Sequence, residues 1–347
     1  MGVTLVDALR SALREARSPW ADAAIEPLPD SGLAHAHLRL AGSGVLARVP
    51  KQSQMDLPAQ ANLDYQAACF TSAAVSGHAP HLHGVLPPSA ALPRGALLVE
   101  EIVGRTARLP LDLPALVDAL AAMHSLPLPE VAWRAPLLDP PDPLALLRDE
   151  IEAQAVFLDA ALLDVRARRA IDERRAALAT LCACAPRPPK RLIAFDAHPG
   201  NFIVRADGRA VLVDLEKARY SLPPLDLAHA TLYTSTTWDI ASAAALSHGE
   251  VAAAQQRWLA RCAGGEAWRG WLAPLRSAMW LWSITWCAKW RVLSAGTARA
   301  GGDGEDWSGE RSEAVLVEHV RERVDHYLSA QGVLRVVDEL EALAGAA

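Results

Sequence analysis

The sequence predicts an α+β protein with two lobes, a small lobe rich in β-strands and a larger, mainly helical lobe. Strand-like segments predominate before about residue 104, whereas helical patterns predominate after it, interrupted by a short hairpin around Asp207. The chain has 347 residues, 51% of them hydrophobic and 21% charged, so it can bury a large core and exceeds the usual size of one domain. We therefore expect an N-lobe over residues 1–103 and a C-lobe over residues 104–347.

The expected N-lobe starts with a helix, because leucines recur at helical spacing over Leu5–Ala16. A turn containing Gly42 and Ser43 then separates two short apolar segments that are typical of strands. In chain order, the remaining elements are strands at 36–40 and 44–49, a helix at 62–75, and strands at 80–86 and 96–102.

The expected C-lobe consists of helices with apolar stripes and charged opposite faces. They are predicted over residues 113–125, 144–164, 165–183, 258–261, 268–275, 277–293, 310–330 and 333–344. Trp282, Trp286 and Trp290 recur at four-residue spacing and therefore share one helix face. Such a stripe is more typical of core packing than of an aromatic cage for a quaternary ammonium ligand.

The most informative stretch is residues 191–216, RLIAFDAHPGNFIVRADGRAVLVDLE. An apolar strand, a turn and a second strand predict a hairpin that brings Asp196, Asn201 and Asp214 to one end. Magnesium-assisted phosphoryl transfer requires one carboxylate to orient and deprotonate a hydroxyl, and a carboxylate plus an amide to hold the metal. A single Asp beside a turn usually has only a structural role, but this joint spacing favours a catalytic function.

The segments DAHPGNFIV and VLVDLE resemble motifs of the aminoglycoside phosphotransferase and choline-kinase-like family, which has a protein-kinase-like two-lobe fold. The resemblance implies that Asp196 is the catalytic base and that His198 lies near the transferring phosphate. It also implies that Asn201 and Asp214 bind Mg²⁺.

Two further features bear on the catalytic loop. Ala194 and Phe195 stand where the family usually has His and Gly, which affects the expected rate and loop geometry more than the reaction type. Asp226, in the segment Asp-Leu-Ala at a predicted helix start, is most simply an N-cap. The resemblance implies in addition that Asp226 holds the backbone of the catalytic loop.

The resemblance also implies a nucleotide site in the N-lobe. Ser31 and Gly32 would form the loop over the phosphates, because small residues let backbone donors approach them. Arg48 stands at the position of the family's phosphate-binding Lys or Arg. The family pairs this cation with a helix Glu, and here Gln66 or Asp64 would have to serve; the residues do not decide between the two.

The segment ALLVEEIVGR resembles the family's hinge strand, so the backbone of Glu100, Glu101 and Ile102 is expected to hold the adenine edge. The implied function is phosphorylation of a hydroxyl on a small aminoglycoside-, choline- or sugar-like acceptor, with ATP as the donor, GTP as an alternative donor, and Mg²⁺ as the cofactor. The competing hypothesis is a kinase-fold protein that binds nucleotide or metabolite without appreciable turnover.

The region after Tyr233 is expected to select the acceptor. Acidic residues beside the Trp-rich helix would suit a cationic hydroxyl compound, although acidic loops are more often simply solvated. These residues are Asp239, Glu266, Asp303, Glu305, Asp306 and Glu310.

Net charge and cysteine content narrow the function classes. A formal net charge of −6 gives no electrostatic footprint for nucleic acid. The five scattered cysteines are typical of reduced thiols in a cytosol. No apolar signal core opens the chain, and Arg276, Lys289 and Arg291 interrupt the Trp-rich segment. We therefore expect a cytoplasmic monomer or homodimer that binds neither nucleic acid nor membrane.

Overall fold

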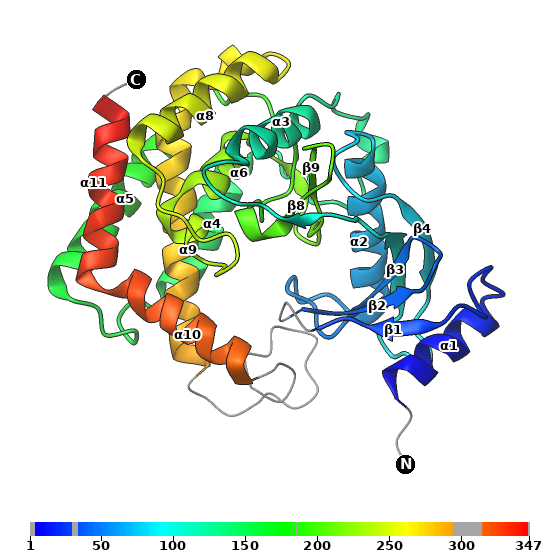
Figure 1. Ribbon diagram of the computed structural model, residues 1–347. Coiled ribbons are helices and arrows are strands. Elements are labelled where there is room, and N and C mark those ends of the chain that lie inside the picture. Colours follow the sequence, from blue (N-terminus) through cyan, green and yellow to red (C-terminus); the bar gives the residue numbers. More distant parts are fainter. Residues whose placement is uncertain (1–3, 30–33, 185, 295–313, 346–347) are drawn as a thin grey trace.

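The computed structural model describes residues 4–29, 34–184, 186–294 and 314–345. Its N-lobe contains a five-stranded antiparallel sheet in the order β1-β2-β3-β5-β4 (Figure 1). The strands are β1 (Ile25–Pro27), β2 (His35–Leu40), β3 (Val45–Pro50), β4 (Leu82–Leu86) and β5 (Ala96–Glu100), and the helices of this lobe are α1 (Leu5–Glu15) and α2 (Ala59–Ala74).

The two helices cover opposite faces of this sheet. Thr4 and Asp7 form a capping box at the start of α1, which fixes where that helix begins. Successive side chains of β5 point to opposite faces of the sheet. Leu98 therefore belongs to the core shared with α1, and Leu97 to the core shared with α2. The core around α2 continues into the C-lobe and includes Leu116, so the sheet and the C-lobe are packed together.

The C-lobe is mainly helical, with α9 at its centre in contact with α4, α6 and α10 (Figure 1). Its α-helices are α3 (Leu113–His124), α4 (Pro143–Ala155), α5 (Val165–Ala183), α6 (Pro224–Thr231), α7 (Tyr233–Thr236), α8 (His248–Arg261), α9 (Leu272–Leu293), α10 (Ala314–Leu328) and α11 (Ala330–Gly345). Short 3₁₀-helices are η1 (Val131–Trp133), η2 (Pro199–Asn201) and η3 (Gly265–Trp271). No helix within the described ranges is both long and apolar enough to cross a bilayer.

Several predicted helices have different bounds in the structure, and the one expected over 258–261 is only the end of α8, which starts at His248. The helix expected over 144–164 ends at Ala155, after which the chain forms turns before α5. The segment expected as a helix over 268–275 is a 3₁₀-helix up to Trp271, and α9 starts only at Leu272. Periodicity alone misses these ends because turns also carry buried apolar residues.

The predicted hairpin is present and belongs to a three-stranded sheet in the order β6-β8-β9. Gly104 precedes β6 and lies so close to β8 that an added Cβ would be 2.5 Å from the carbonyl oxygen of Val204. The strands are β6 (Arg105–Thr106), β8 (Phe202–Val204) and β9 (Ala210–Leu212), and a separate pair joins β7 (Arg191–Ile193) to β10 (Arg219–Ser221). The strand β7 ends just before the loop that contains Asp196, and β8 begins just after it, so each sheet holds one end of this loop.

Candidate active site

Asp226 anchors the loop that follows β7. Its buried carboxylate accepts hydrogen bonds from the backbone N–H groups of Ala194, at 2.7 Å, and Phe195, at 2.8 Å. It also lies 3.1 Å from Nε2 of His124. The indole N–H of Trp258 donates to Nδ1 of His124 at 3.0 Å, so Nε2 carries the proton that His124 donates to Asp226.

Asp226 is the third residue of α6 and not its N-cap. The N-cap residue is Pro223, and no side chain caps this helix end. The N-cap interpretation of the sequence is therefore wrong, because the carboxylate is used by the distant loop after β7 instead of by its own helix. His124, which sequence reasoning had no cause to connect with this loop, belongs to the same buried network.

Phe195 has a left-handed backbone conformation, with φ of 63°. This conformation is unfavourable for a bulky residue and explains why glycine suits the position. The buried ring contacts Arg219, whose guanidinium carbon is 3.8 Å from the ring centroid, and packs edge-on against Trp282 at a centroid distance of 5.0 Å. Packing of the aromatic ring therefore offsets the backbone strain in this chain.

We expect Phe195→Gly to be more stable than Phe195→Ala, which reverses the usual order of these two residues. Both variants lose the buried ring, at a cost of about 3–5 kcal/mol of unfolding free energy. Only glycine also relieves the left-handed backbone, which is worth about 1 kcal/mol. Urea unfolding of the two variants measures the difference, and an alanine variant equal to or more stable than the glycine variant contradicts the strain at this position.

Asp196 lies among basic side chains. Its Oδ2 atom accepts a hydrogen bond from Nζ of Lys217 at 2.9 Å, and its Oδ1 atom is 3.8 Å from Nδ1 of His229. Burial alone would raise the pKa of Asp196, but the charge of Lys217, together with the neighbouring imidazoles of His198 and His229, outweighs burial and holds that pKa below its usual range. Burial lowers the pKa of His229 to about 4, so this imidazole is neutral near pH 7.

Asn201 joins the loop to the end of β9. Its side-chain amide donates to the backbone carbonyl of Asp196 at 2.8 Å, and its backbone carbonyl accepts from the backbone N–H of Val213 at 2.9 Å. Asp214 is the next residue after Val213. The structure thus brings Asp196, Asn201 and Asp214 into one neighbourhood, while His198 stands beside His229 with ring centroids 6.2 Å apart.

Arg48 reaches this neighbourhood from β3. Its guanidinium donates to Oδ1 of Asp214 at 2.8 Å and to the backbone carbonyl of Val213 at 3.0 Å. Burial raises the pKa of Asp214, yet the charge of Arg48 outweighs burial and the pKa of this carboxyl is lowered. This contact links the sheet of the N-lobe directly to the segment after β9.

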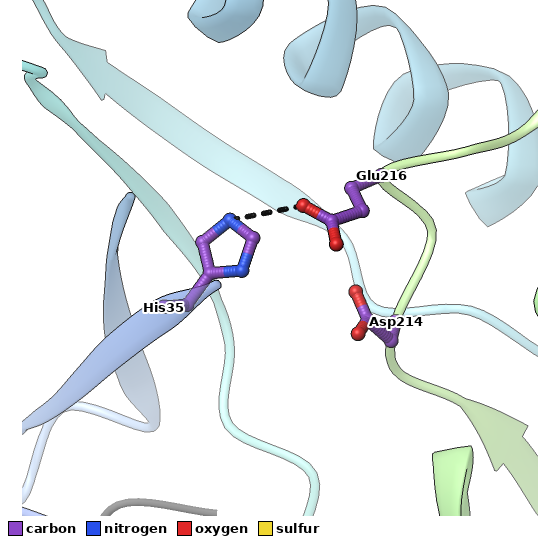
Figure 2. A group of neighbouring side chains, drawn as sticks. All are labelled: His35, Asp214 and Glu216. Carbon is purple, nitrogen blue, oxygen red and sulfur yellow. Dashed lines mark ion pairs between the residues drawn. The ribbon is translucent and has the colours of Figure 1, made fainter. Parts of the chain in front are cut away.

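Asp214 of this ion pair, which is half-buried, also forms a polar group with the buried residues His35 and Glu216 (Figure 2). Arg48 donates to Nδ1 of His35 at 3.2 Å, so Nε2 of His35 carries the proton and donates to Oε1 of Gln66 at 3.0 Å. Burial and the charge of Arg48 lower the pKa of His35. Burial and the neighbouring Asp214 raise the pKa of Glu216 to about 8.

This group bears on which residues could hold a metal. One potential ligand atom from each of His35, Asp214 and Glu216 lies within 4.8 Å of the others. Both ring nitrogens of His35 already contact Arg48 and Gln66, whereas Asp214 offers the carboxylate oxygen atoms that Mg²⁺ prefers. The donor set therefore fits magnesium through carboxylate and amide oxygens better than a metal bound by imidazole.

The link between α2 and Arg48 runs through Gln66. Its amide oxygen contacts His35, which in turn contacts Arg48. Asp64, the other residue considered for this role, is exposed and accepts a hydrogen bond from Gln60. Thus α2 places no negative charge opposite Arg48, and the two are connected by hydrogen bonds through Gln66 and His35.

The other residues expected at the nucleotide site are placed as follows. Ser31 and Gly32 lie outside the described residues. The side chain of Glu100 pairs with Arg205, and that of Glu101 accepts from Nε of Arg39 at 2.6 Å. The backbone N–H of Glu101 donates to the carbonyl of Gly44, and Ile102 is half-buried.

Sequence reasoning missed four polar residues of this site, namely His35, Glu216, Lys217 and His229. Each is separated by a long stretch of chain from at least one of the side chains it faces, such as His35 from Glu216 and His229 from Asp196. Glu216 and Lys217 did carry a local signal, because they directly follow a strand end that already bears Asp214. No pattern within β2 distinguishes His35 from an ordinary strand residue.

Solved structures share this fold over nearly the whole chain. A choline/ethanolamine kinase family protein from Mesorhizobium loti matches with a TM-score of 0.58 at 16% identity, covering 98% of this chain and 99% of that one. A GDP complex of aminoglycoside 2'-phosphotransferase-IIIa matches with a TM-score of 0.59 at 14% identity, covering 94% and 99%. A streptomycin–ATP ternary complex of APH(2")-IIa matches with a TM-score of 0.52 at 14% identity, covering 94% and 97%.

Together, the antiparallel N-lobe sheet, the helical C-lobe and these matches define a protein of kinase-like fold. The model of the phosphotransferase enzyme family, APH, matches residues 37–271. The chain belongs to this phosphotransferase family. Comparison with curated protein sequences gives no match.

Proposed function

We propose that this protein transfers the γ-phosphoryl group of a nucleoside triphosphate, ATP or GTP, to a hydroxyl group of a small molecule in the presence of Mg²⁺. The observation that carries this proposal is the continuous hydrogen-bonded path from Asp196 through Asn201 to Val213 and Asp214. Membership of the phosphotransferase family supports the reaction class. The GDP and ATP complexes of structurally similar proteins support nucleotide as the donor.

The proposed division of roles follows from the chemistry of the side chains. Asp196 accepts the proton of the acceptor hydroxyl, whose oxygen forms a bond to the γ-phosphorus while the bond from that phosphorus to the β-phosphate oxygen breaks. Asn201 and Asp214 would hold Mg²⁺, which supplies positive charge to the phosphate oxygens when bound. Asp226 keeps the loop in place through its bonds to Ala194 and Phe195.

The nucleotide would lie between the two lobes. Arg48 is the proposed cation for the phosphates, and Ser31 and Gly32 the proposed loop above them. The backbone of Glu100, Glu101 and Ile102 is the proposed contact for the base, which leaves the carboxylates of both glutamates in their ion pairs with Arg205 and Arg39. His198 would stand near the transferring group, two residues after the base.

The proposed acceptor is a small alcohol of the aminoglycoside, choline or sugar type, bound over the catalytic loop. The Trp stripe of α9 is engaged in packing, since Trp290 is buried and the indole N–H of Trp282 donates to Glu150. Of the acidic residues considered for a cationic acceptor, Asp239 lies against Gly200 of the loop, and Glu266 pairs with Arg269. The other four, Asp303, Glu305, Asp306 and Glu310, lie outside the described residues.

Replacing Asp214 tests the metal assignment. We expect Asp214→Ala to weaken binding of a non-hydrolysable ATP analogue in the presence of Mg²⁺ by about tenfold or more, because the variant loses a metal ligand. In EDTA the variant should show no loss of affinity, because neither protein then holds a metal. Calorimetric titration with and without Mg²⁺ measures both values.

Asp207→Ala is the matched control, because Asp207 is an exposed carboxylate on the same hairpin that accepts a hydrogen bond from the N–H of Arg209. It should bind nucleotide like the wild type under both conditions. If the magnesium dependence of nucleotide affinity is unchanged in Asp214→Ala, Asp214 is not a metal ligand. Binding without phosphorylation of any amino alcohol, sugar or aminoglycoside supports the competing hypothesis of a nucleotide-binding protein without turnover.

A further inference from the structure

Lys217 is a residue of the site to which neither the family motif nor the proposed roles assign a function. It follows Asp214 by three residues, so the same segment after β9 carries both the proposed metal ligand and this cation. Its Nζ atom is 2.9 Å from Oδ2 of Asp196 and 5.9 Å from the ring centroid of Trp282. Its side chain is only 14% exposed.

The position of this ammonium group relative to the base is what matters chemically. A hydroxyl that gives its proton to Asp196 must lie about 2.7 Å from a carboxylate oxygen. Lys217 contacts that same carboxylate, so its ammonium group and the attacking oxygen would both be bound to the carboxylate of Asp196. The phosphorus must approach that oxygen, which brings the phosphoryl oxygens toward Lys217.

The other basic groups nearby differ from Lys217 in position or in charge. Arg48 is bound to Asp214 and to the backbone of Val213. His229 is neutral near pH 7 because burial lowers its pKa to about 4. Among the residues that the structure describes, Lys217 is therefore the permanent cation in direct contact with the proposed base.

An ion pair between Lys217 and Asp196 with only a structural role would be unfavourable for catalysis. A cation in direct contact with Asp196 makes this carboxylate a weaker proton acceptor. That loss is offset if the same cation stabilises charge that develops later in the reaction. Negative charge spreads over the three equatorial phosphoryl oxygens in the transition state, and a fixed cation beside them acts more strongly there than in the ground state.

We propose that Lys217 is a catalytic residue that donates a hydrogen bond to the transferring phosphoryl group while Asp196 takes the acceptor proton. This inference rests on the proposed function. The acceptor oxygen forms its bond to the γ-phosphorus, the electron pair of the broken bond leaves with the nucleoside diphosphate, and the hydroxyl proton ends on Asp196. Lys217 keeps its own proton throughout. An ammonium group donates up to three hydrogen bonds, so contact with Asp196 and with a phosphoryl oxygen is compatible.

In the proposed mechanism, the contact of Lys217 with Asp196 is strongest before transfer, and its contact with the phosphoryl oxygens is strongest during transfer. Before transfer, Asp196 is an anion and holds Lys217 in place. As the proton arrives, the carboxyl loses its charge and its attraction for the ammonium group weakens. Lys217 then interacts most strongly with the phosphoryl oxygens at the moment when their charge is most widely spread.

The test uses a probe that needs no knowledge of the acceptor. Mg²⁺–ADP is titrated calorimetrically into the full-length protein with and without aluminium fluoride, which mimics the planar phosphoryl group. Wild-type protein should bind ADP more tightly when the fluoride complex is present. We expect Lys217→Met to bind Mg²⁺–ADP within about twofold of wild type but to lose about 10²-fold of the gain from aluminium fluoride, the loss typical of removing one transition-state donor.

Three further variants complete the experiment. Lys217→Arg should recover part of the gain, because it retains the charge. Lys190→Met is the control for loss of a lysine, since Lys190 pairs with Asp139 away from the loop, and it should keep the full gain. Lys217→Gln retains a donor to Asp196 without the charge and replaces the methionine variant if thermal unfolding shows that variant to be unfolded.

The outcomes separate this inference from the proposed function. A full wild-type gain in Lys217→Met or Lys217→Gln overturns the role of Lys217 while leaving phosphoryl transfer intact. Failure of the wild type to bind Mg²⁺–ADP overturns the proposed function, and the role of Lys217 falls with it. A loss of ADP affinity equal to the loss with aluminium fluoride shows a general effect on the site and also overturns the inference.

Discussion

Asp196→Asn is expected to slow phosphoryl transfer by about 10²–10⁴-fold, the usual contribution of a general base, while Mg²⁺–ATP affinity stays within about twofold. The amide has nearly the shape of the carboxylate but accepts no proton. The bond from the Asn201 side chain goes to the backbone carbonyl of residue 196, so it survives the substitution. Turnover is measured with the best acceptor from a panel of amino alcohols, sugars and aminoglycosides.

Asp207→Asn again provides the control, as an exposed carboxylate of the neighbouring hairpin whose loss should leave the rate unchanged. A rate within a few-fold of wild type for Asp196→Asn would mean that another group takes the proton. Equal losses of nucleotide affinity in Asp196→Asn and Asp214→Ala would contradict the separation of base from metal ligand.

Asp226→Ala is expected to destabilise the protein by about 3–5 kcal/mol of unfolding free energy. The substitution leaves the buried N–H groups of Ala194 and Phe195 without acceptors, and the ring N–H of His124 as well. Each buried unsatisfied donor costs about 1–3 kcal/mol, and removing one partner of a buried charged network costs about 3–5 kcal/mol. Urea unfolding followed by circular dichroism measures the change.

Asp226→Asn is the graded comparison. Its single carbonyl oxygen satisfies only part of the set, so its stability should fall between those of the wild type and the alanine variant. A loss below about 1 kcal/mol in Asp226→Ala would show that water or local rearrangement satisfies the loop N–H groups and that Asp226 does not fix the loop.

The features that the sequence predicted well are local in the chain. The hairpin of β8 and β9 and the cluster of Asp196, Asn201 and Asp214 lie within one stretch of about two dozen residues, where turn and strand patterns can be read directly. The order of strands and helices also follows from periodicity. Both kinds of signal need only neighbouring residues.

The features that the sequence did not predict depend on distant contacts. Arg48 and Asp214 are 166 positions apart, and the pairing of His35 with Gln66 depends on how α2 packs on the sheet. The strand β6 is only two residues long, too short for an alternating pattern, and β10 is recognised only from its pairing with β7. Side-chain partners of this kind become visible only when the chain is folded.

The ion pair of Arg48 and Asp214 has a consequence for how ligands enter the site. In the proposed reaction the same carboxylate serves Mg²⁺, so two cations compete for one anion. A triphosphate offers the displaced guanidinium a new anionic partner and thereby lowers the cost of metal entry. Nucleotide and metal then bind with positive cooperativity, each strengthening the other by the same factor. If Asp214 binds Mg²⁺ as proposed, free Mg²⁺ alone would meet a carboxylate that Arg48 already neutralises, and it would bind weakly until nucleotide is present.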